Sequence, residues 1–566
     1  MKNKKDIKKI SVFGPGVVGM PMAAGLAESC LKGEFAPGAF VQVIQRDSRR
    51  SGWKVPEINS GKSPIGGIEP GLEEAIARSV TGGTLKASHD YLEAIDSDLI
   101  IVAVQTDKKG LGPDYGPLMN VMEQVAEVVG KSATTPVVIS ESTLAPSTIN
   151  TVLRPFFQEK GLKEGRDLFL GISPNRVMPG LLMDRVRHSD KLIGCLNEEA
   201  GFLVRDIYQT MSSGDLHTVN SFTAECVKTA ENCYRDVMIA FAAELARYCD
   251  RKNYNFLELR KQLNDSIGHA DAVGEQRNAV PQGAILLPTT GVGGHCLPKD
   301  GILLSWRYTE SSGKKAGIIL KSREINDQSP QYLYDMAAAK SGGRISGKAA
   351  VLGASYLFNS DDTRNSPSLA LAAILRENGL EFLVHDPYVR PEDFYLELLG
   401  LTDYLTDNLE ETLRGAEVVF IGTGHGIYYD IADQLPDCVQ LVVDGTHIID
   451  RGDWDYSRHK LVGIGHGTGK VPDDFVQFAH QAYDFVQWGF AQELKDICEF
   501  YDRTYLKDEP NYGRLDYRKV RELVNTCPAG RFVADADAIP AGIPQHPDSG
   551  EFELLKIAAD YHSAQM

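Results

Sequence analysis

Residue types able to do covalent chemistry gather in one segment, residues 287–301, which reads LPTTGVGGHCLPKDG. The segment holds three glycines that allow a ligand to approach the backbone closely, Gly291, Gly293 and Gly294. Cys296 follows them, with Lys299 and Asp300 shortly after. A thiolate needs nearby positive charge or hydrogen-bond donors at neutral pH. A buried structural cysteine at a turn is the alternative, but the density of glycine, lysine and aspartate favours a nucleophile.

A second pair, Lys228 and Asn232, lies in a stretch predicted to be helical. Residues 221–250 contain no glycine or proline and carry apolar residues at helical spacing. A spacing of i, i+4 puts both side chains on one helix face. Because Glu225 and Glu231 are close by, the pair taken alone is more typical of a solvated face.

A glycine-rich turn near the start predicts a dinucleotide site. The motif G-x-G-x-x-G is formed by Gly14, Gly16 and Gly19, with Val18 before the last glycine. It directly follows a strand-like run (10–13) and precedes an alanine-rich helical stretch (20–28). In that context the glycines make the tight turn, admit the pyrophosphate and let helix and strand pack. A plain glycine-rich turn is the alternative.

The residue that would bind the ribose should end the second strand, which the run 40–45 predicts. Asp47 is the best candidate, although it lies further along than usual. Three arginines beside it, Arg46, Arg49 and Arg50, could instead serve a 2′-phosphate. The pattern favours NAD, with NADP as the alternative.

The remaining pattern predicts an α/β protein with two Rossmann-like, doubly wound domains. Short apolar runs at 98–104, 135–140 and 168–173 alternate with helical patterns. After a glycine-rich linker (342–347), a second strand–helix region begins, with strand-like runs at 348–355, 381–388, 417–424 and 441–447.

We therefore expect four parts. They are an N-terminal NAD-binding domain (1–216), a helical central domain with the cysteine segment (217–341), a second Rossmann-like domain (342–474) and a C-terminal extension of unknown role (475–566). The extension starts with an aromatic-rich helical stretch (475–501). Because residues 221–250 carry more apolar surface than a connector needs, we predict a homodimer or larger oligomer built on that helix.

Composition excludes several classes of protein. The 566 residues carry a net charge of −18, which argues against non-specific nucleic-acid or anionic-membrane binding. The nine cysteines show neither a disulfide framework nor a metal-ligand spacing. We therefore expect no metal, and we expect reduced thiols in a cytoplasmic protein. No long apolar run predicts a transmembrane helix. The sequence GIGHGTGK (463–470) lacks the P-loop residues and predicts a flexible loop.

Taken together, the motifs resemble the nucleotide-sugar 6-dehydrogenase family over about residues 8–470. The most specific is GVGGHCLPKD; the others, in order, are FGPGVVG, INSGKSPIGGIEPGLEE, ESTLAPST, SPNRVMPG, AECVKTAENCYRDVMIAFAAELA, DDTRNSPSL and HDPYV. The resemblance implies two-step oxidation of a UDP-sugar C6 alcohol to the uronate with NAD. NRVMPG and GGHC resemble the N-acetylhexosamine branch, whereas CLPKD resembles the glucose and GDP-mannose branches.

The resemblance also implies roles for individual residues. Cys296 would form a thiohemiacetal and then a thioester, Lys228 would stabilise an oxyanion, and Asn232 would orient substrate or water. Asp300 would assist base chemistry and Thr143 would lie near the reacting atoms. Residues implied at the cofactor are Thr106, Thr143, Lys299 and Arg364, and residues implied at the nucleotide sugar are Lys228, Asn232, Leu287, Thr289 and Gly293.

The chain departs from the family pattern at three places. Asn175 replaces a glutamate, which puts thioester hydrolysis in doubt, and Glu141 is the nearest substitute acid in sequence. Leu357 replaces a lysine, and the extension has no counterpart. These departures keep a second function open, in which a catalytically impaired nucleotide-sugar sensor or scaffold acts through its extension.

Overall fold

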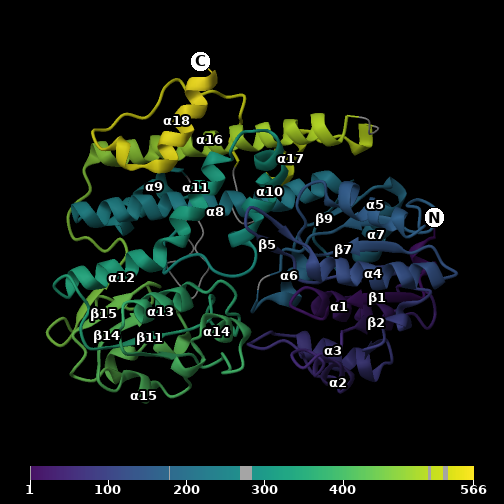
Figure 1. The fold of residues 1–566 in the computed structure, drawn as a ribbon, viewed down its shortest axis with the longest axis horizontal. Helices are drawn as coiled ribbons and strands as arrows, with labels where there is room; N and C mark the ends of the chain where they lie inside the picture. The colour runs from purple at the N-terminus through teal and green to yellow at the C-terminus, as the bar shows by residue number, and fades with distance from the viewer. Residues whose placement is uncertain (1, 178, 268–283, 508–510, 527–532, 566) are drawn as a thin grey trace. The chain divides into compact units, whose positions relative to one another are not determined.

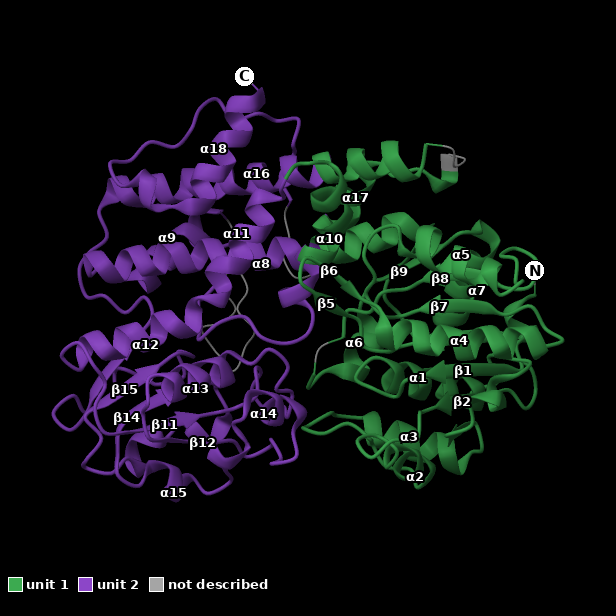
Figure 2. Ribbon diagram, viewed as in Figure 1, with its two compact units in different colours: residues 1–230, 302–314, 496–524 green, residues 231–301, 315–495, 525–566 purple. Residues whose placement is uncertain are grey.

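The computed structural model describes residues 2–177, 179–267, 284–507, 511–526 and 533–565. The chain forms two compact units (Figure 2). Unit 1 comprises Met1–Ala230, Ile302–Lys314 and Asp496–Val524, and unit 2 comprises Glu231–Gly301, Lys315–Lys495 and Asn525–Met566. Two long helices, α8 (Ser221–Lys252) and α16 (Asp473–Tyr505), begin in one unit and end in the other. The glycine-rich linker 342–347 lies inside unit 2, between a helix and a strand.

Unit 1 is built on a sheet with the strand order β10-β9-β8-β7-β4-β1-β2-β3. Figure 1 labels β9, β7, β1 and β2 of this sheet. Neighbouring strands pair in parallel, except for β8 with β9. The strands are β1 (Lys9–Phe13), β2 (Phe40–Ile44), β3 (Leu85–Ser88), β4 (Leu99–Val102), β7 (Val137–Ser140), β8 (Phe169–Ile172), β9 (Lys191–Cys195) and β10 (Leu216–Asn220). A separate hairpin pairs β5 (Asp107–Lys109) with β6 (Gly112–Asp114).

Helices cover this sheet because its strands are apolar on both faces, as parallel strands usually are. The helices are α1 (Gly19–Leu31), α2 (Lys54–Asn59), α3 (Leu72–Thr81), α4 (Gly116–Lys131), α5 (Arg154–Glu159), α6 (Leu182–His188) and α7 (Glu198–Tyr208). Helix α17 (Tyr517–Asn525) belongs to the same unit up to Val524. The core of the unit joins α1 to β1 and β2 through residues such as Met20, Val12 and Val43.

Unit 2 has a second sheet, with the order β13-β12-β11-β14-β15-β16 and parallel pairing. The strands are β11 (Lys348–Leu352), β12 (Phe382–His385), β13 (Leu405–Thr406), β14 (Ala416–Ile421), β15 (Leu441–Asp444) and β16 (Lys460–Gly463). The helices are α9 (Phe256–Ile267), α11 (Gly317–Asp327), α12 (Ser329–Lys340), α13 (Pro367–Glu377), α14 (Phe394–Leu399), α15 (Leu409–Leu413) and α18 (Glu553–Gln565). Helix α10 (Leu297–Ser311) starts in unit 2 and continues in unit 1.

The predicted fold class is confirmed, since both sheets have the Rossmann-like βα pattern. The predicted strand runs correspond to strands of these sheets. The apolar runs of the sequence did not predict β3, β9, β10, β13 and β16, nor the hairpin strands β5 and β6. These strands are short, and β3 (LKAS) and β16 (KLVG) carry exposed polar residues, so they lack a long apolar run.

The segment 463–470, predicted to be a flexible loop, begins at the last residue of β16 and is held by backbone hydrogen bonds. It is tied to the connection between α8 and α9: Gly469 N donates to Asn253 O at 2.7 Å, and Asn255 N donates to Gly469 O at 2.9 Å. A Cβ at Gly467 would lie 2.2 Å from Tyr254 O. The glycines therefore allow close backbone packing.

The apolar surface of α8, from which a homodimer was predicted, is used within the chain. Tyr248 of α8 stacks on Phe475 of α16 with ring centroids 4.5 Å apart, and Phe241 lies 6.3 Å from Tyr483. The homodimer stays a prediction, but surplus apolar surface on α8 no longer supports it. Among the described residues, no helix has both the length and the apolarity to cross a bilayer.

Candidate functional site

The glycine-rich turn of unit 1 has the geometry of a dinucleotide cradle. Gly14 has φ +92°, and a Cβ there would lie 2.5 Å from Ala103 O. A Cβ at Gly19 would lie 2.1 Å from Gly14 O, whereas one at Gly16 would meet nothing within 4 Å. Val18, the N-cap of α1, makes no side-chain cap. The open backbone at Gly16 and the uncapped helix start suit a pyrophosphate.

Asp47 lies beyond the end of β2, on an exposed loop. Ser48 and Ser51 form that loop with a hydroxyl contact of 2.7 Å. Lys54 Nζ donates to Pro15 O at 3.3 Å and so ties the start of α2 to the glycine-rich turn. This contact places the loop that carries Asp47 next to the cradle.

Thr106 and Thr143 follow the carboxyl ends of neighbouring strands β4 and β7. Thr106 Oγ1 donates to Thr143 O at 2.8 Å. The structure therefore brings these two predicted residues together at the sheet edge where β1 leads into the cradle, which is where parallel α/β sheets bind ligands.

Asn175 belongs to a buried polar cluster that sequence analysis did not find. Its Nδ2 donates to Glu141 Oε2 at 3.1 Å. Lys191 Nζ donates to the same oxygen at 2.6 Å, and Tyr208 OH donates to Oε1 at 2.6 Å. Burial lowers the pKa of Lys191, while Glu141 opposes that shift. Glu141 thus already accepts three hydrogen bonds, which leaves its oxygens little room to accept a proton from an attacking water.

Lys228 and Asn232 lie on the predicted helix, but their face is not solvated. Each is 5% exposed, and Glu225 and Glu231 are fully buried. Glu225 accepts from Ser147 N at 2.8 Å and from Ile149 N at 2.9 Å. Burial raises the pKa of Glu225 to about 8. The solvated-face interpretation was therefore wrong, because tertiary packing buries all four polar side chains.

In unit 2, Cys296 directly precedes α10 and is exposed. Its carbonyl oxygen accepts from Lys299 N at 3.2 Å and from Asp300 N at 2.9 Å, as at the start of a helix. Cys296 is therefore the residue at which α10 starts, next to the backbone N–H groups of the first helical turn.

The glycine turn before Cys296 is clipped to the segment 356–365. Gly294 N donates to Arg364 O at 2.8 Å, and Asn365 Nδ2 donates to Gly294 O at 2.9 Å. A Cβ at Gly293 would lie 2.4 Å from Cβ of Tyr356, and one at Gly294 would lie 2.9 Å from its ring. Tyr356, which sequence analysis missed, thus explains why both positions are glycine.

Asp300 holds two other predicted residues. Its Oδ1 accepts from Lys299 Nζ at 2.6 Å, and its Oδ2 accepts from Asn232 Nδ2 at 2.6 Å. Lys299 is 1% exposed and Asp300 is fully buried. The charge on Lys299, predicted to serve the cofactor, is therefore neutralised by Asp300.

The remaining predicted site residues of unit 2 are Arg364, Leu287 and Thr289. The Arg364 guanidinium is held by Asp362, with Nε to Oδ1 at 2.8 Å. The segment with Leu287 and Thr289 is anchored on both sides: Ile285 N donates to Asn264 Oδ1 at 2.8 Å, and His447 Nε2 lies 2.7 Å from Pro288 O. Neither anchor carried a recognisable motif.

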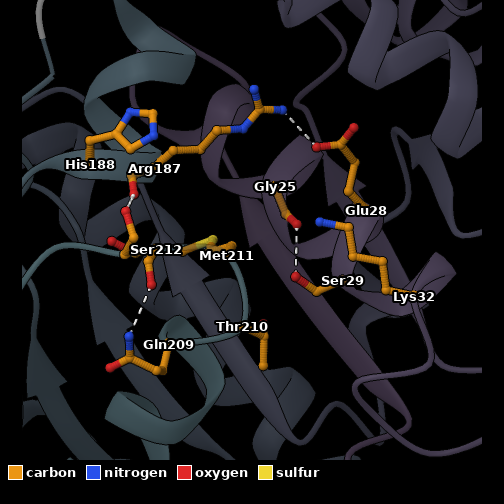
Figure 3. A pocket seen from close by; sticks show the side chains of 11 residues that line it. Gly25, Glu28, Ser29, Lys32, Arg187, His188, Gln209, Thr210, Met211 and Ser212 are labelled. Carbon is orange, nitrogen blue, oxygen red and sulfur yellow. Dashed lines mark hydrogen bonds and ion pairs between the residues drawn. The ribbon is translucent and has the colours of Figure 1, made fainter.

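Unit 1 also has a hollow of about 310 Å³ that is separate from the predicted site residues (Figure 3). It is lined by the C-terminal half of α1, the end of α6 and residues 209–213, and Arg187 Nη2 there donates to Glu28 Oε2 at 2.9 Å. The cradle is at the other end of α1, so this hollow is no part of the dinucleotide site. No group of three or more His, Cys, Asp or Glu in the described part of the chain is arranged for a metal ion.

Comparison with known proteins identifies the family. Three domains of the UDP-glucose/GDP-mannose dehydrogenase family match in order: the NAD binding domain at residues 8–212, the central domain at 222–328 and the UDP binding domain at 350–451. The chain belongs to this family and is an NAD-dependent nucleotide-sugar dehydrogenase.

Individual relatives are similar over nearly their full lengths. A UDP-N-acetyl-D-mannosamine dehydrogenase of Pyrococcus horikoshii is 31% identical over 448 residues, covering 78% of this chain and 96% of the relative. The structure of a UDP-D-ManNAc dehydrogenase from the same organism is 30% identical, with TM-score 0.66, covering 81% and 99%. An NDP-N-acetyl-D-galactosaminuronic acid dehydrogenase from Methanosarcina mazei Go1 is 29% identical, with TM-score 0.65, covering 83% and 100%.

Proposed function

We propose that this enzyme oxidises the C6 alcohol of UDP-N-acetyl-D-mannosamine to the carboxylate. The observation that carries the chemistry is Cys296 at the start of α10, on a glycine turn clipped to Arg364 and Asn365. The substrate is favoured because several curated relatives over this length are named for it. UDP-glucose is the second candidate, since CLPKD resembles that branch.

The reaction removes four electrons from C6 in two steps. NAD, when bound at the glycine cradle of unit 1, would supply the oxidising power for both steps, so that one turnover would use two NAD. After the first step the Cys296 thiolate adds to the aldehyde carbon and forms a thiohemiacetal; loss of the second hydride leaves a thioester, which water cleaves to carboxylate and free thiol. The rigid glycine turn keeps the sulfur in one position through these steps.

The polar residues around α8 have supporting roles. Lys228 stabilises the oxyanion of the tetrahedral adduct. Asn232, oriented by its hydrogen bond to Asp300, positions substrate or water. The buried Lys299–Asp300 pair supports this arrangement without a net charge. Gly14, Gly16 and Gly19 with the start of α1 hold the cofactor pyrophosphate.

Thioester hydrolysis is the slow step in this proposal. Asn175 cannot accept a proton at neutral pH, and the lone pairs of Glu141 already accept hydrogen bonds from Lys191, Tyr208 and Asn175. We therefore expect a burst of NADH followed by a slower steady rate, with the acyl group carried on Cys296.

The test measures NADH and uronate with UDP-N-acetylmannosamine, UDP-glucose and GDP-mannose. We expect the highest kcat/KM with UDP-N-acetylmannosamine and two NADH for each uronate. A higher kcat/KM with UDP-glucose would replace the proposed substrate. Tight binding of these sugars without turnover would favour the sensor function instead.

A further inference from the structure

The C-terminal extension covers the helix that carries Lys228 and Asn232. No residue from Ser221 to Asp250 of α8 is exposed in the single chain. A helix of this length in an isolated chain usually leaves one face to solvent. The face that would be left here is occupied by α16.

The two helices run antiparallel along their lengths. Ring contacts link them at regular intervals, and the number on α16 falls as the number on α8 rises: Phe222 with Tyr501, Tyr234 with Phe490, Phe241 with Tyr483 and Tyr248 with Phe475. Each of these pairs lies within one unit. Trp488 and Tyr501 are also among the largest fully buried side chains. The contact is therefore a continuous aromatic interface.

Polar contacts in unit 2 make this interface specific. Glu244 of α8 accepts from Glu553 N at 2.7 Å and from Leu554 N at 3.3 Å, at the start of α18. In return, Glu493 of α16 accepts from Ile318 N at 2.9 Å and from Ile319 N at 3.0 Å, at the start of α11. Each carboxylate satisfies backbone donors of a helix on the other side. Apolar contact alone would not produce such reciprocal capping.

This cover is an addition to the family framework. The UDP binding domain match ends at residue 451, and the Pyrococcus horikoshii structure is covered at 99% while spanning 81% of this chain. Without α16, the rings on α8 would form a large exposed apolar patch, which a stable protein covers by association.

We infer that the extension is a built-in partner for α8, occupying the face on which a second copy would otherwise pack, and that the active enzyme is a single chain. A second copy cannot reach α8 unless α16 leaves it. The extension thereby maintains the position of Lys228 and Asn232 without an oligomer.

The first test measures the mass of the full-length protein by light scattering over about a 100-fold range of concentration, together with specific activity. We expect 62.1 kDa throughout and a specific activity that does not change on dilution. A mass of two or more chains, or activity that falls on dilution, would overturn the inference.

The second test separates the inner face of α16 from its outer face in the full chain. Tyr483→Ser with Phe490→Ser weakens the contact with Phe241 and Tyr234. Gln477→Ser with Gln481→Ser, on exposed positions of the same helix, is the matched control. We expect the inner pair to self-associate with rising concentration and the control to stay a single chain. If the Tyr483→Ser, Phe490→Ser variant remains a fully active single chain, the inference is overturned. If that variant does not fold, the mass and the dilution series of the full-length parent protein decide the question.

Discussion

Asn175 donates a hydrogen bond from Nδ2 to Oε2 of Glu141 at 3.1 Å, and its Oδ1 accepts from Arg176 N at 3.0 Å. The amide is therefore held in one orientation. A position where the family pattern has an acid is occupied here by a neutral side chain beside a buried carboxylate. An acid introduced at position 175 would therefore lie beside the carboxylate of Glu141, and this neighbour would affect its ability to act as a base.

Asn175→Glu should raise the steady rate of NADH formation by up to ~10-fold, but mainly at alkaline pH. The new carboxylate would face Glu141, and like charges raise the pKa of one member of such a pair. The gain in rate should therefore grow as the pH rises and the new side chain loses its proton. The measurement is the steady rate against pH, with Asn175→Gln as an uncharged control of similar length. Identical profiles for the two variants would show that residue 175 does not limit hydrolysis.

Glu141→Gln should destabilise the protein by about 3–5 kcal/mol, because it leaves Lys191 buried without its counter-charge. The Lys191–Glu141 distance of 2.6 Å and the near-complete burial of both side chains support this expectation. Chemical denaturation measures the change, and Glu127→Gln, at an exposed pair with Lys131, is the control. Equal, small losses in the free energy of unfolding for the two variants would contradict the expected destabilisation.

Cys296→Ala should lower uronate formation by on the order of 10³-fold or more, with NAD affinity nearly unchanged. The thiol is needed for the covalent adduct, whereas the glycine cradle lies in unit 1. Uronate and NAD binding are measured separately. Cys438→Ala, at another exposed thiol, should behave as the parent enzyme. Parent-level uronate from Cys296→Ala would rule out the covalent mechanism.

Asp300→Asn should reduce both stability and kcat, since Lys299 loses its counter-charge and the single amide oxygen cannot accept from both Lys299 Nζ and Asn232 Nδ2 as the carboxylate does. A double change, Lys299→Met with Asp300→Leu, removes the buried pair as a whole and should recover most of the stability. It should not recover kcat, because Asn232 stays unoriented. Recovery of both would mean that the pair has only a structural role.

Glu244 should make stability depend on pH. Burial raises the pKa of Glu244 from 4.5 to about 7. A raised folded-state pKa means that the stabilisation is complete below pH 4.5 and is lost as the pH rises through about 7, a change of about 3 kcal/mol. The Glu244→Gln variant should not show this pH-dependent part of the free energy of unfolding.

The free energy of unfolding of parent and Glu244→Gln would be compared from about pH 5 to about 8, where only the difference between them reports on this group. Glu258→Gln, at an exposed carboxylate of α9, is the control. Parallel pH curves for parent and Glu244→Gln would contradict the expected shift.

Features that depend on neighbours in the chain could be predicted from the order of the amino acids. The glycine cradle, the strand runs, the helix 221–250 and the cysteine turn were predictable, because glycine spacing and apolar periodicity act within a few residues. The helix in the extension was also visible as an aromatic-rich stretch, which became α16.

The partner of each buried face, by contrast, became known from the folded chain. The pairing of Glu141 with Lys191, the clip of Tyr356 on the glycine turn and the cover of α8 by α16 join residues far apart in the chain. Apolar periodicity shows that a helix face must be buried, but not whether a second copy or the chain's own extension covers it. Lys228 and Asn232, taken alone, were more typical of a solvated face for the same reason, since burial and its compensating hydrogen bonds depend on partners that local sequence does not specify.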